Sequence, residues 1–188
     1  EFEDLGANVI YVLPGSGVQG FTAQQIEGIE LNDRDLEAVK RARGLETAGP
    51  ILYDSVQAEF KGETGRVPLL GMPTDESQEA VMRANSLEVE TGRNIRSSDV
   101  SSGLAGDRIG DVFDDTPGLR SQVTVRNRDI RIVGLLKSTG DPEYDSGIFL
   151  PIDSARDLLG EEERTDFIIA VPQDGFEPQE VAENIEEE

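Results

Sequence analysis

The first part of the chain alternates between short apolar runs and polar breaks. Residues 8–13 form an apolar run rich in β-branched side chains that ends at a Pro-Gly pair, which is typical of a buried strand. The Gly- and Ser-rich stretch at residues 15–31 favours a loop. Asn32 or Asp33 can then cap an amphipathic helix that continues to about residue 43, where a glycine follows.

A hairpin and two helices are predicted next. Residues 51–60 and 66–72 read as strands, and the turn composition of residues 61–65 joins them. The polar stretch 75–84 predicts a short helix. Apolar residues at helical spacing within residues 103–113 predict another.

The clearest alternation in the chain belongs to a second hairpin. Val123 and Val125 alternate with polar residues, Asn127 marks the turn, and the apolar positions resume at Ile130 and Ile132.

The C-terminal part repeats the pattern of a strand followed by a helix. Residues 148–151 predict a strand, and Asp153 or Ser154 can cap the helix that follows. Residues 166–171 predict a further buried strand, and residues 177–187 predict an amphipathic helix.

This order predicts an α+β fold with two subdomains. The strand and helix at each end of the chain can share one sheet, so we expect a discontinuous subdomain from residues 1–73 and 165–188. Residues 74–164 are then an inserted, mixed and β-rich subdomain. This arrangement predicts that the two chain ends emerge close together, as in a domain inserted between two anchored segments.

The charge of the chain narrows the classes of partner. There are 39 acidic and 17 basic residues, a formal net charge of −22, and only three of the basic residues are lysines. Nucleic acid and anionic lipid surfaces are therefore disfavoured as partners. A dense carboxylate surface suits molar salt, where screening suppresses self-repulsion, so we predict a halophilic, haloarchaeal origin. An ordinary acidic mesophilic protein is the alternative.

Missing residue types exclude several chemistries. The chain has no Cys and no His, so it has no disulfides, no thiolate chemistry and no imidazole base or metal ligand. No apolar run approaches the ~20 residues that a membrane helix needs. Both ends of the chain look like those of an excised fragment. We expect no catalytic, cofactor-binding or metal-binding residues.

Two segments resemble ligand-binding motifs. Gly15, Gly17 and Gly20 match the GxGxxG dinucleotide fingerprint directly after a predicted strand, but no capped helix follows, which favours a simple loop. Asp141, Glu143 and Asp145 alternate as in a calcium loop, so a weak cation site near these three residues stays open. The glycine falls one place late and the twelfth position is not Glu, which favours a solvated loop.

Hydrolase chemistry has little support. The serine pairs at residues 97–98 and 101–102 have no histidine base and no nucleophile elbow, which favours turns and caps. A pair of carboxylates for glycoside chemistry stays an open alternative, although the chain has few aromatic residues and no Trp to stack on a sugar.

Several segments together resemble the extracytoplasmic domain of ABC permeases of the MacB/FtsX type. The chain opens on an LGANVIYVLPG segment, carries a short VETGR segment, and contains a hairpin that ends in VGLL. It then shows a GIFLP strand before a SARDLL helix. The matching segments are residues 5–15, 88–93, 106–110, 126–136, 147–151 and 154–159.

The resemblance implies a porter-like α/β subdomain from the two chain ends, with the inserted subdomain between them. It implies a non-catalytic domain outside the membrane that couples ATP-driven conformational change to the handling of a substrate or partner. The implied partners are flanking transmembrane helices, a cytoplasmic ATP-binding subunit and a second permease copy. The alternative is a free-standing cell-surface binding domain without transport.

Overall fold

The computed structural model describes residues 9–14 and 31–187. The helices and strands in this part of the chain confirm the predicted α+β class. In chain order they are β1 (Ile10–Val12), α1 (Asp33–Arg41), β2 (Leu45–Phe60), β3 (Glu63–Met72), α2 (Gln78–Ala84), β4 (Val89–Gly92), β5 (Ser102–Ala105), the 3-10 helix η1 (Ile109–Asp111), β6 (Gln122–Val125), β7 (Arg128–Leu136), α3 (Pro142–Asp145), β8 (Ile148–Pro151), α4 (Ile152–Leu159), β9 (Phe167–Pro172) and α5 (Pro178–Glu186).

The chain folds into two compact units. Unit 1 contains the described parts of residues 1–51, 75–86 and 163–188, and unit 2 contains residues 52–74 and 87–162. Residues 52–74 pack in unit 2 because β3 pairs with β8 and β2 pairs with β6. The predicted porter-like and inserted subdomains, with boundaries after residues 73 and 164, stay a prediction.

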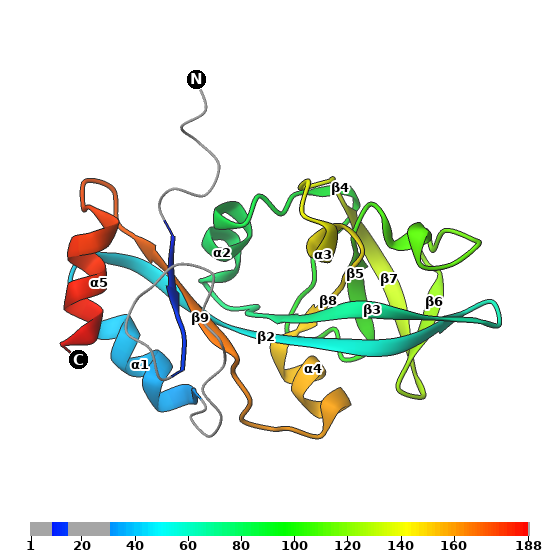
Figure 1. Cartoon of the computed structure of the whole chain (residues 1–188), viewed down its shortest axis with the longest axis horizontal. Coiled ribbons are helices and arrows are strands. Elements are labelled where there is room, and N and C mark those ends of the chain that lie inside the picture. The colour runs from blue at the N-terminus through cyan, green and yellow to red at the C-terminus, as the bar shows by residue number, and fades with distance from the viewer. Residues whose placement is uncertain (1–8, 15–30, 188) are drawn as a thin grey trace. The chain divides into compact units, whose positions relative to one another are not determined.

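Unit 1 is built on a three-stranded antiparallel sheet in the order β1, β9, β2. Ile168 and Ala170 of β9 face one side, where they join a core with the inward residues of α1 and α5, among them Leu36, Val39 and Val181. Helix α2 contacts β9 and lies on the other side of the sheet (Figure 1). The sheet of unit 1 is therefore covered on both faces, as α/β layer packing requires.

Helix α1 begins as its sequence predicts. The Asn32 side chain accepts a hydrogen bond from the backbone N–H of Arg34, and the backbone N–H of Asn32 donates to the carboxylate of Asp35. These bonds satisfy backbone donors that the first turn of a helix leaves without partners. Gly44 adopts a φ of +83°, which a residue with a Cβ rarely adopts.

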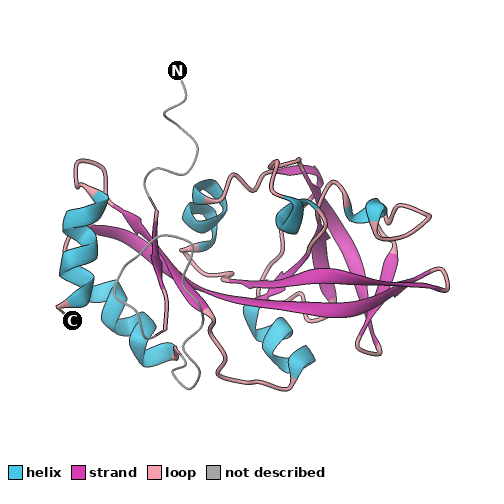
Figure 2. Cartoon of the chain, viewed as in Figure 1, coloured by secondary structure: helices cyan, strands magenta, loops and turns pink. Residues whose placement is uncertain are grey.

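Unit 2 is a closed β-barrel. The pairing runs β2–β3–β8–β5–β7–β6 and returns to β2, so six strands close on themselves. Figure 2 shows these strands curving round one another. Closure leaves the barrel strands without an open sheet edge along most of their length. Strand β4 adds to β7 at residues 134–136, beyond the end of β6.

Alternating apolar residues of the strands fill the barrel. Ile130 and Ile132 of β7 are fully buried, while Arg131 between them is exposed. Phe60 and Phe113 pack edge to face with ring centroids 5.9 Å apart. The remaining core comes mainly from Leu52, Val56, Val67, Leu69, Val123, Val125, Ile148 and Leu150.

Two sequence predictions are wrong in detail. Residues 103–113 do not form a helix. Ser102–Ala105 is instead strand β5, held between β7 and β8, and only the 3-10 turn Ile109–Asp111 follows. Helix α4 begins after Pro151 with no side-chain cap, because the Ser154 hydroxyl donates to the backbone carbonyl of Asp99 instead.

Candidate functional site

The dinucleotide-like motif at Gly15, Gly17 and Gly20 lies outside the described residues. The other candidates from the sequence, the acidic loop and the serine pairs, belong to unit 2.

The three acidic residues of the calcium-like loop do not converge on one point. Asp145 is 2% exposed, and its carboxylate accepts hydrogen bonds from the Ser138 hydroxyl and from the backbone and hydroxyl of Thr139. Asp141 instead caps α3 by accepting from the backbone N–H of Glu143. Within the described residues no three Asp, Glu, His or Cys side chains are grouped as metal ligands.

The electrostatics of Asp145 fit a structural role. Burial by itself raises the pKa of Asp145, but the hydrogen bonds from Ser138 and Thr139 outweigh it and hold the pKa below its usual range. The carboxylate is therefore an ionised acceptor that ties residues 138–140 to α3.

Glu143 serves to attach the same loop to the barrel. The Tyr53 hydroxyl of β2 donates to Glu143 Oε2. Burial, the hydrogen bond to Glu143 and the nearby charges of Glu143, Asp54 and Asp141 raise the pKa of Tyr53 to about 12. The phenol therefore stays protonated and keeps donating at all physiological pH values.

The two serine pairs flank Asp99 in the sequence, and the Asp99 carboxylate is held by hydrogen bonds. Arg93 donates to both oxygens of Asp99, and the backbone N–H of Arg96 donates to Asp99 at 2.9 Å. The hydrogen bonds from Arg93 lower the pKa of Asp99 against the opposing effect of burial. The hydrogen-bonding oxygens of Asp99 therefore hold together the loop at residues 93–101.

In the described part of the chain, a polar depression of about 810 Å³ beside β2 is a candidate binding site. It lies where the pairing of two barrel strands stops: β6 pairs with β2 only at Ala58 and Glu59. No described strand pairs with this edge of β2 at residues 54–57. We call this feature the β2 depression. Its lining residues are Asp54, Ser55, Val56, Gln57, Ala58, Glu59, Thr64, Thr124, Arg126, Asn127 and Glu161.

A strained turn brings the one basic lining residue into place. Arg126 and Asn127 connect β6 to β7 with φ values of +46° and +66°. Positive φ at both central residues matches the twist of the two strands, and such turns favour Asn-Gly over Arg-Asn. Nothing in the described chain forms an ion pair with Arg126. Arg126 therefore stands at a position that a smaller residue would occupy with less strain.

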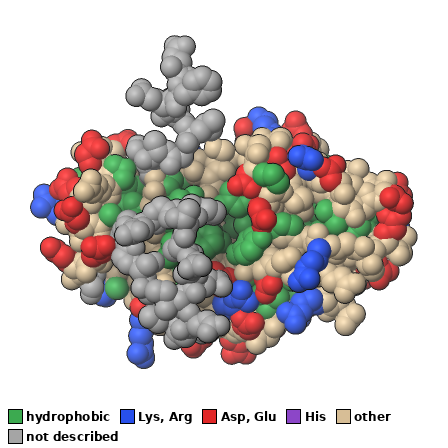
Figure 3. Space-filling model, viewed as in Figure 1, with side chains coloured by type: hydrophobic (Ala, Val, Ile, Leu, Met, Phe, Trp, Pro, Cys, Tyr) green, Lys and Arg blue, Asp and Glu red, His purple; other side chains and the backbone are tan. Residues whose placement is uncertain are grey.

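The β2 depression has the features of a recognition surface. Its lining combines three carboxylates, those of Asp54, Glu59 and Glu161, with one guanidinium and a stretch of strand edge. Such an edge can pair with an added extended segment through backbone hydrogen bonds, while the charges select its side chains. Figure 3 shows acidic side chains scattered over the visible face with few basic ones between them.

Sequence reasoning missed this site because its residues come from separate parts of the chain. Asp54 and Glu59 belong to β2, Arg126 to the β6–β7 turn, and Glu161 follows α4. The turn position of residue 127 was the only local signal.

Comparisons with known proteins identify what the chain resembles. The model of the family described as the MacB-like periplasmic core domain matches residues 1–188. An uncharacterised ABC transporter permease of Methanocaldococcus jannaschii is 24% identical over 186 residues, and the match covers 98% of this chain and 45% of that protein. The uncharacterised ABC transporter permease YknZ of Bacillus subtilis is 25% identical over 138 residues, which is 68% of this chain and 33% of YknZ. The chain therefore spans less than half the length of either relative.

Solved structures share the fold. The periplasmic region of MacB from Actinobacillus actinomycetemcomitans superposes with a TM-score of 0.79 at 14% identity, covering 100% of this chain and 85% of that one. The extracellular domain of YknZ from Gram-positive bacteria gives a TM-score of 0.68 at 17% identity, covering 89% of this chain and 85% of that one. No helix in the described part of this chain is long and apolar enough to cross a membrane.

Proposed function

Because the chain belongs to the family of MacB-like periplasmic core domains and is the extracytoplasmic domain of a MacB-like ABC transporter permease, we propose that it couples ATP-driven conformational change to the handling of a substrate or partner outside the membrane. The proposed partners within the transporter are the flanking transmembrane helices, a cytoplasmic ATP-binding subunit and a second permease copy. Rigid-body motion of packed units is a common way to carry such a change.

One observation carries the proposal: β2 belongs to both units. Residues 45–51 of this 16-residue strand pair with β9 in unit 1, and residues 52–60 pair with β3 in unit 2. Backbone hydrogen bonds hold the strand on both sides of the boundary. β2 is therefore the strand through which a displacement of the unit 1 sheet would reach the backbone of the barrel.

The β2 depression is the proposed place of handling. It lies on the part of β2 that enters the barrel, so the same strand that would transmit motion also lines the candidate binding surface. A shift of β2 against β6 would change the width of the depression, because only Ala58 and Glu59 join these two strands.

We propose that the domain itself carries no chemistry. In support, the two buried carboxylates Asp99 and Asp145 hold loops in place: Asp99 binds Arg93, and Asp145 binds Ser138 and Thr139. Tyr53, whose pKa is raised to about 12, is held as a hydrogen-bond donor and is poorly suited to act as a base.

Spin labels on the full-length permease test the proposal. This chain has no Cys, so Gln179→Cys in unit 1 and Asp107→Cys in unit 2 add two exposed labelling sites to the domain, in a permease whose other cysteines are replaced. The permease is reconstituted with its ATP-binding subunit, and the distance between the two labels is measured by pulsed electron spin resonance. Coupling predicts that the distance distribution shifts between the nucleotide-free state and the state trapped with ATP and vanadate.

A matched pair within one unit controls for local loop motion. Labels at Asp107 and Arg128 both lie in unit 2 and should keep one distance in both states. An unchanged distance between the units with active ATP hydrolysis would contradict coupling.

A further inference from the structure

The outer face of β7 and its neighbours carries arginines that form no ion pairs. Arg96, Arg120 and Arg131 are exposed, and no carboxylate of the described chain is hydrogen-bonded to the guanidinium of any of them. We call these three residues, together with Val100 and Leu119, the arginine face.

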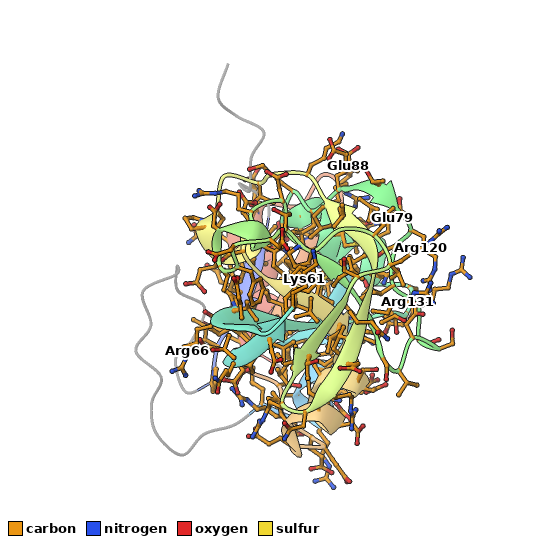
Figure 4. The ribbon with its side chains drawn as sticks, turned by 90° about the vertical axis from the view of Figure 1, so that its right-hand side faces the viewer. Lys61, Arg66, Glu79, Glu88, Arg120 and Arg131 are labelled. Atoms are coloured by element: carbon orange, nitrogen blue, oxygen red, sulfur yellow. The ribbon has the colours of Figure 1, made fainter. Side chains whose placement is uncertain are left out.

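Backbone pairing brings the arginine face together. Arg131 lies opposite Gln122 of β6 and Ser102 of β5, and its N–H donates to the carbonyl of Ser101. The N–H of Arg120 donates to the carbonyl of Ile132, which directly follows Arg131 in β7. Arg120 therefore lies beside this part of β7. Figure 4 shows Arg120 and Arg131 near each other, with both side chains pointing away from the ribbon.

Hydrogen bonds hold the loop at residues 93–101, which carries Arg96 and Val100. Arg93 bonds both oxygens of Asp99, and the same carboxylate accepts the N–H of Arg96. The Asp99 carbonyl accepts a bond from Ser154 of α4. The backbone that carries Arg96 and Val100 is therefore ordered before any partner binds, which lowers the entropy cost of binding.

Arg120 occupies a position that costs backbone strain. Its φ is +68°, in the left-handed region that Gly and Asn adopt far more readily. Strained residues persist where surrounding contacts hold them, as the bond from the Arg120 N–H to Ile132 does here, and they are enriched at functional sites.

The apolar members of the face are unusual too. Val100 is 61% exposed and Leu119 is 39% exposed, and they are the exposed large apolar side chains of the described chain. Val100 precedes Ser101, which bonds to Arg131, and Leu119 directly precedes Arg120. Exposed apolar groups beside arginines are the composition that protein interfaces favour.

The high acidity of the chain makes arginines without carboxylate partners unexpected on the arginine face. With 39 carboxylates in the chain, several other basic residues form ion pairs, such as Arg83 with Glu46 and Arg128 with Asp157. Arg120 and Arg131 have no carboxylate partner in the described chain and repel each other, and the carboxylate nearest Arg96, that of Asp99, is already bound by Arg93. A ligand that brings its own carboxylates would remove this repulsion.

We propose that the arginine face docks an acidic segment of a separate partner protein, in which carboxylates alternate with apolar side chains. Arg120 and Arg131 would hold two carboxylates through paired N–H donors, and Val100 and Leu119 would cover the apolar side chains between them. A membrane surface or a second copy of this chain fits less well, because a net charge of −22 repels an anionic bilayer and a second chain of the same charge. A short segment carries few charges, and salt screens the long-range repulsion while leaving close contacts in place.

The docking proposal rests on the proposed function only in that the partner binds outside the membrane. The two can fail separately, since binding is measured on this chain alone and coupling on the full-length permease.

Fluorescence anisotropy with a synthetic probe tests the docking. The probe is a fluorescein-labelled peptide of about 14 residues in which Glu and Asp alternate with Leu and Val, and the control peptide has Gln and Asn in place of the acids. We expect the acidic peptide to bind the wild-type chain and the amide peptide to bind at least about tenfold more weakly. R120Q/R131Q should weaken binding of the acidic peptide by about the same factor.

A charge-matched variant shows whether the position matters. R34Q/R43Q removes two exposed arginines from unit 1 and changes the net charge by the same amount. It should change the affinity by less than about twofold. Circular dichroism checks that each variant is folded. Equal weakening by both double variants, or no binding of the acidic peptide, overturns the proposal.

Two further outcomes would name another occupant. Flotation with phosphatidylglycerol vesicles that is lost in R120Q/R131Q, without peptide binding, replaces the partner protein by a lipid surface. Sedimentation that shows a dimer of the wild-type chain and a monomer of R120Q/R131Q replaces it by a second copy.

Discussion

Arg93 holds Asp99 through two parallel hydrogen bonds, Nη1 to Oδ2 at 2.7 Å and Nη2 to Oδ1 at 2.8 Å. The carboxylate is nearly buried, with 10% of its side chain exposed, whereas the guanidinium is 40% exposed. Bidentate pairing fixes the orientation of both groups. This pair anchors the loop that leads from β4 to β5, a segment that local sequence patterns describe poorly.

Replacing Asp99 should destabilise the barrel. In Asp99→Ala the side chain of Arg93 and the backbone N–H of Arg96 lose their acceptor, so we expect the free energy of unfolding to fall by about 2–3 kcal/mol. Urea unfolding followed by circular dichroism measures the change. The control is Asp111→Ala, which breaks an ion pair whose two side chains are each 59% exposed. It should cost less than about 0.5 kcal/mol, and equal losses in the two variants would refute a special role for Asp99.

Asp145 should contribute stability that depends on pH. Its pKa in the folded state is lowered by bonds from Ser138 and Thr139. The contribution is therefore fully present above the unfolded carboxyl pKa of about 3.9 and is lost as the pH falls through the lower folded value. Asp145→Asn should be less stable than wild type at about pH 7, and the difference should shrink at about pH 3. A difference that stays constant across this range would show that the charge of Asp145 is not responsible.

Gly106 should tolerate no side chain. A Cβ built on it would lie 2.3 Å from the carbonyl oxygens of Tyr144 and Asp145, and both are backbone atoms that are held in place. The N–H of Gly106 also donates to Gly147. Gly106→Ala should lower the free energy of unfolding by about 2 kcal/mol or more, because the close approach of the two segments is lost. Gly118→Ala, where no atom lies within 4 Å, should be close to neutral in the same unfolding experiment.

Replacing Arg126 should stabilise the chain and remove a charge from the β2 depression. Arg126→Asn places a residue that adopts positive φ readily in the β6–β7 turn, and we expect a gain of about 0.5–1 kcal/mol in unfolding free energy. The same change removes the one basic side chain that lines the β2 depression. A gain in stability together with loss of function in the full-length permease would place Arg126 in the handling surface. A loss of stability would show that the turn already suits arginine.

Salt should stabilise the chain strongly. A formal net charge of −22 creates self-repulsion that counterions screen, so the thermal midpoint should rise markedly between about 0.1 M and 3 M KCl. Circular dichroism after desalting measures the effect. An unchanged spectrum and midpoint at low salt would contradict adaptation to molar salt.

Local signals in the sequence were sufficient for elements that stabilise themselves. Helix α1 carries its own cap in Asn32, and the β2–β3 and β6–β7 hairpins combine alternating strands with a two-residue turn. In these elements the deciding contacts lie within a few residues, so composition and spacing predict them. The acidity, the lack of Cys and His, and the α+β class also follow from the sequence alone.

Only the tertiary structure decided the rest. Residues 103–105, which the sequence predicts as the start of a helix, belong to strand β5 because β7 and β8 offer hydrogen-bond partners on both sides. Barrel closure depends on the two-residue contact between β6 and β2, and that contact in turn leaves the edge of β2 at residues 54–57 open. The β2 depression and the arginine face both join segments far apart in the chain. Long-range pairing is set by the packing of the whole core, which no short stretch of sequence encodes.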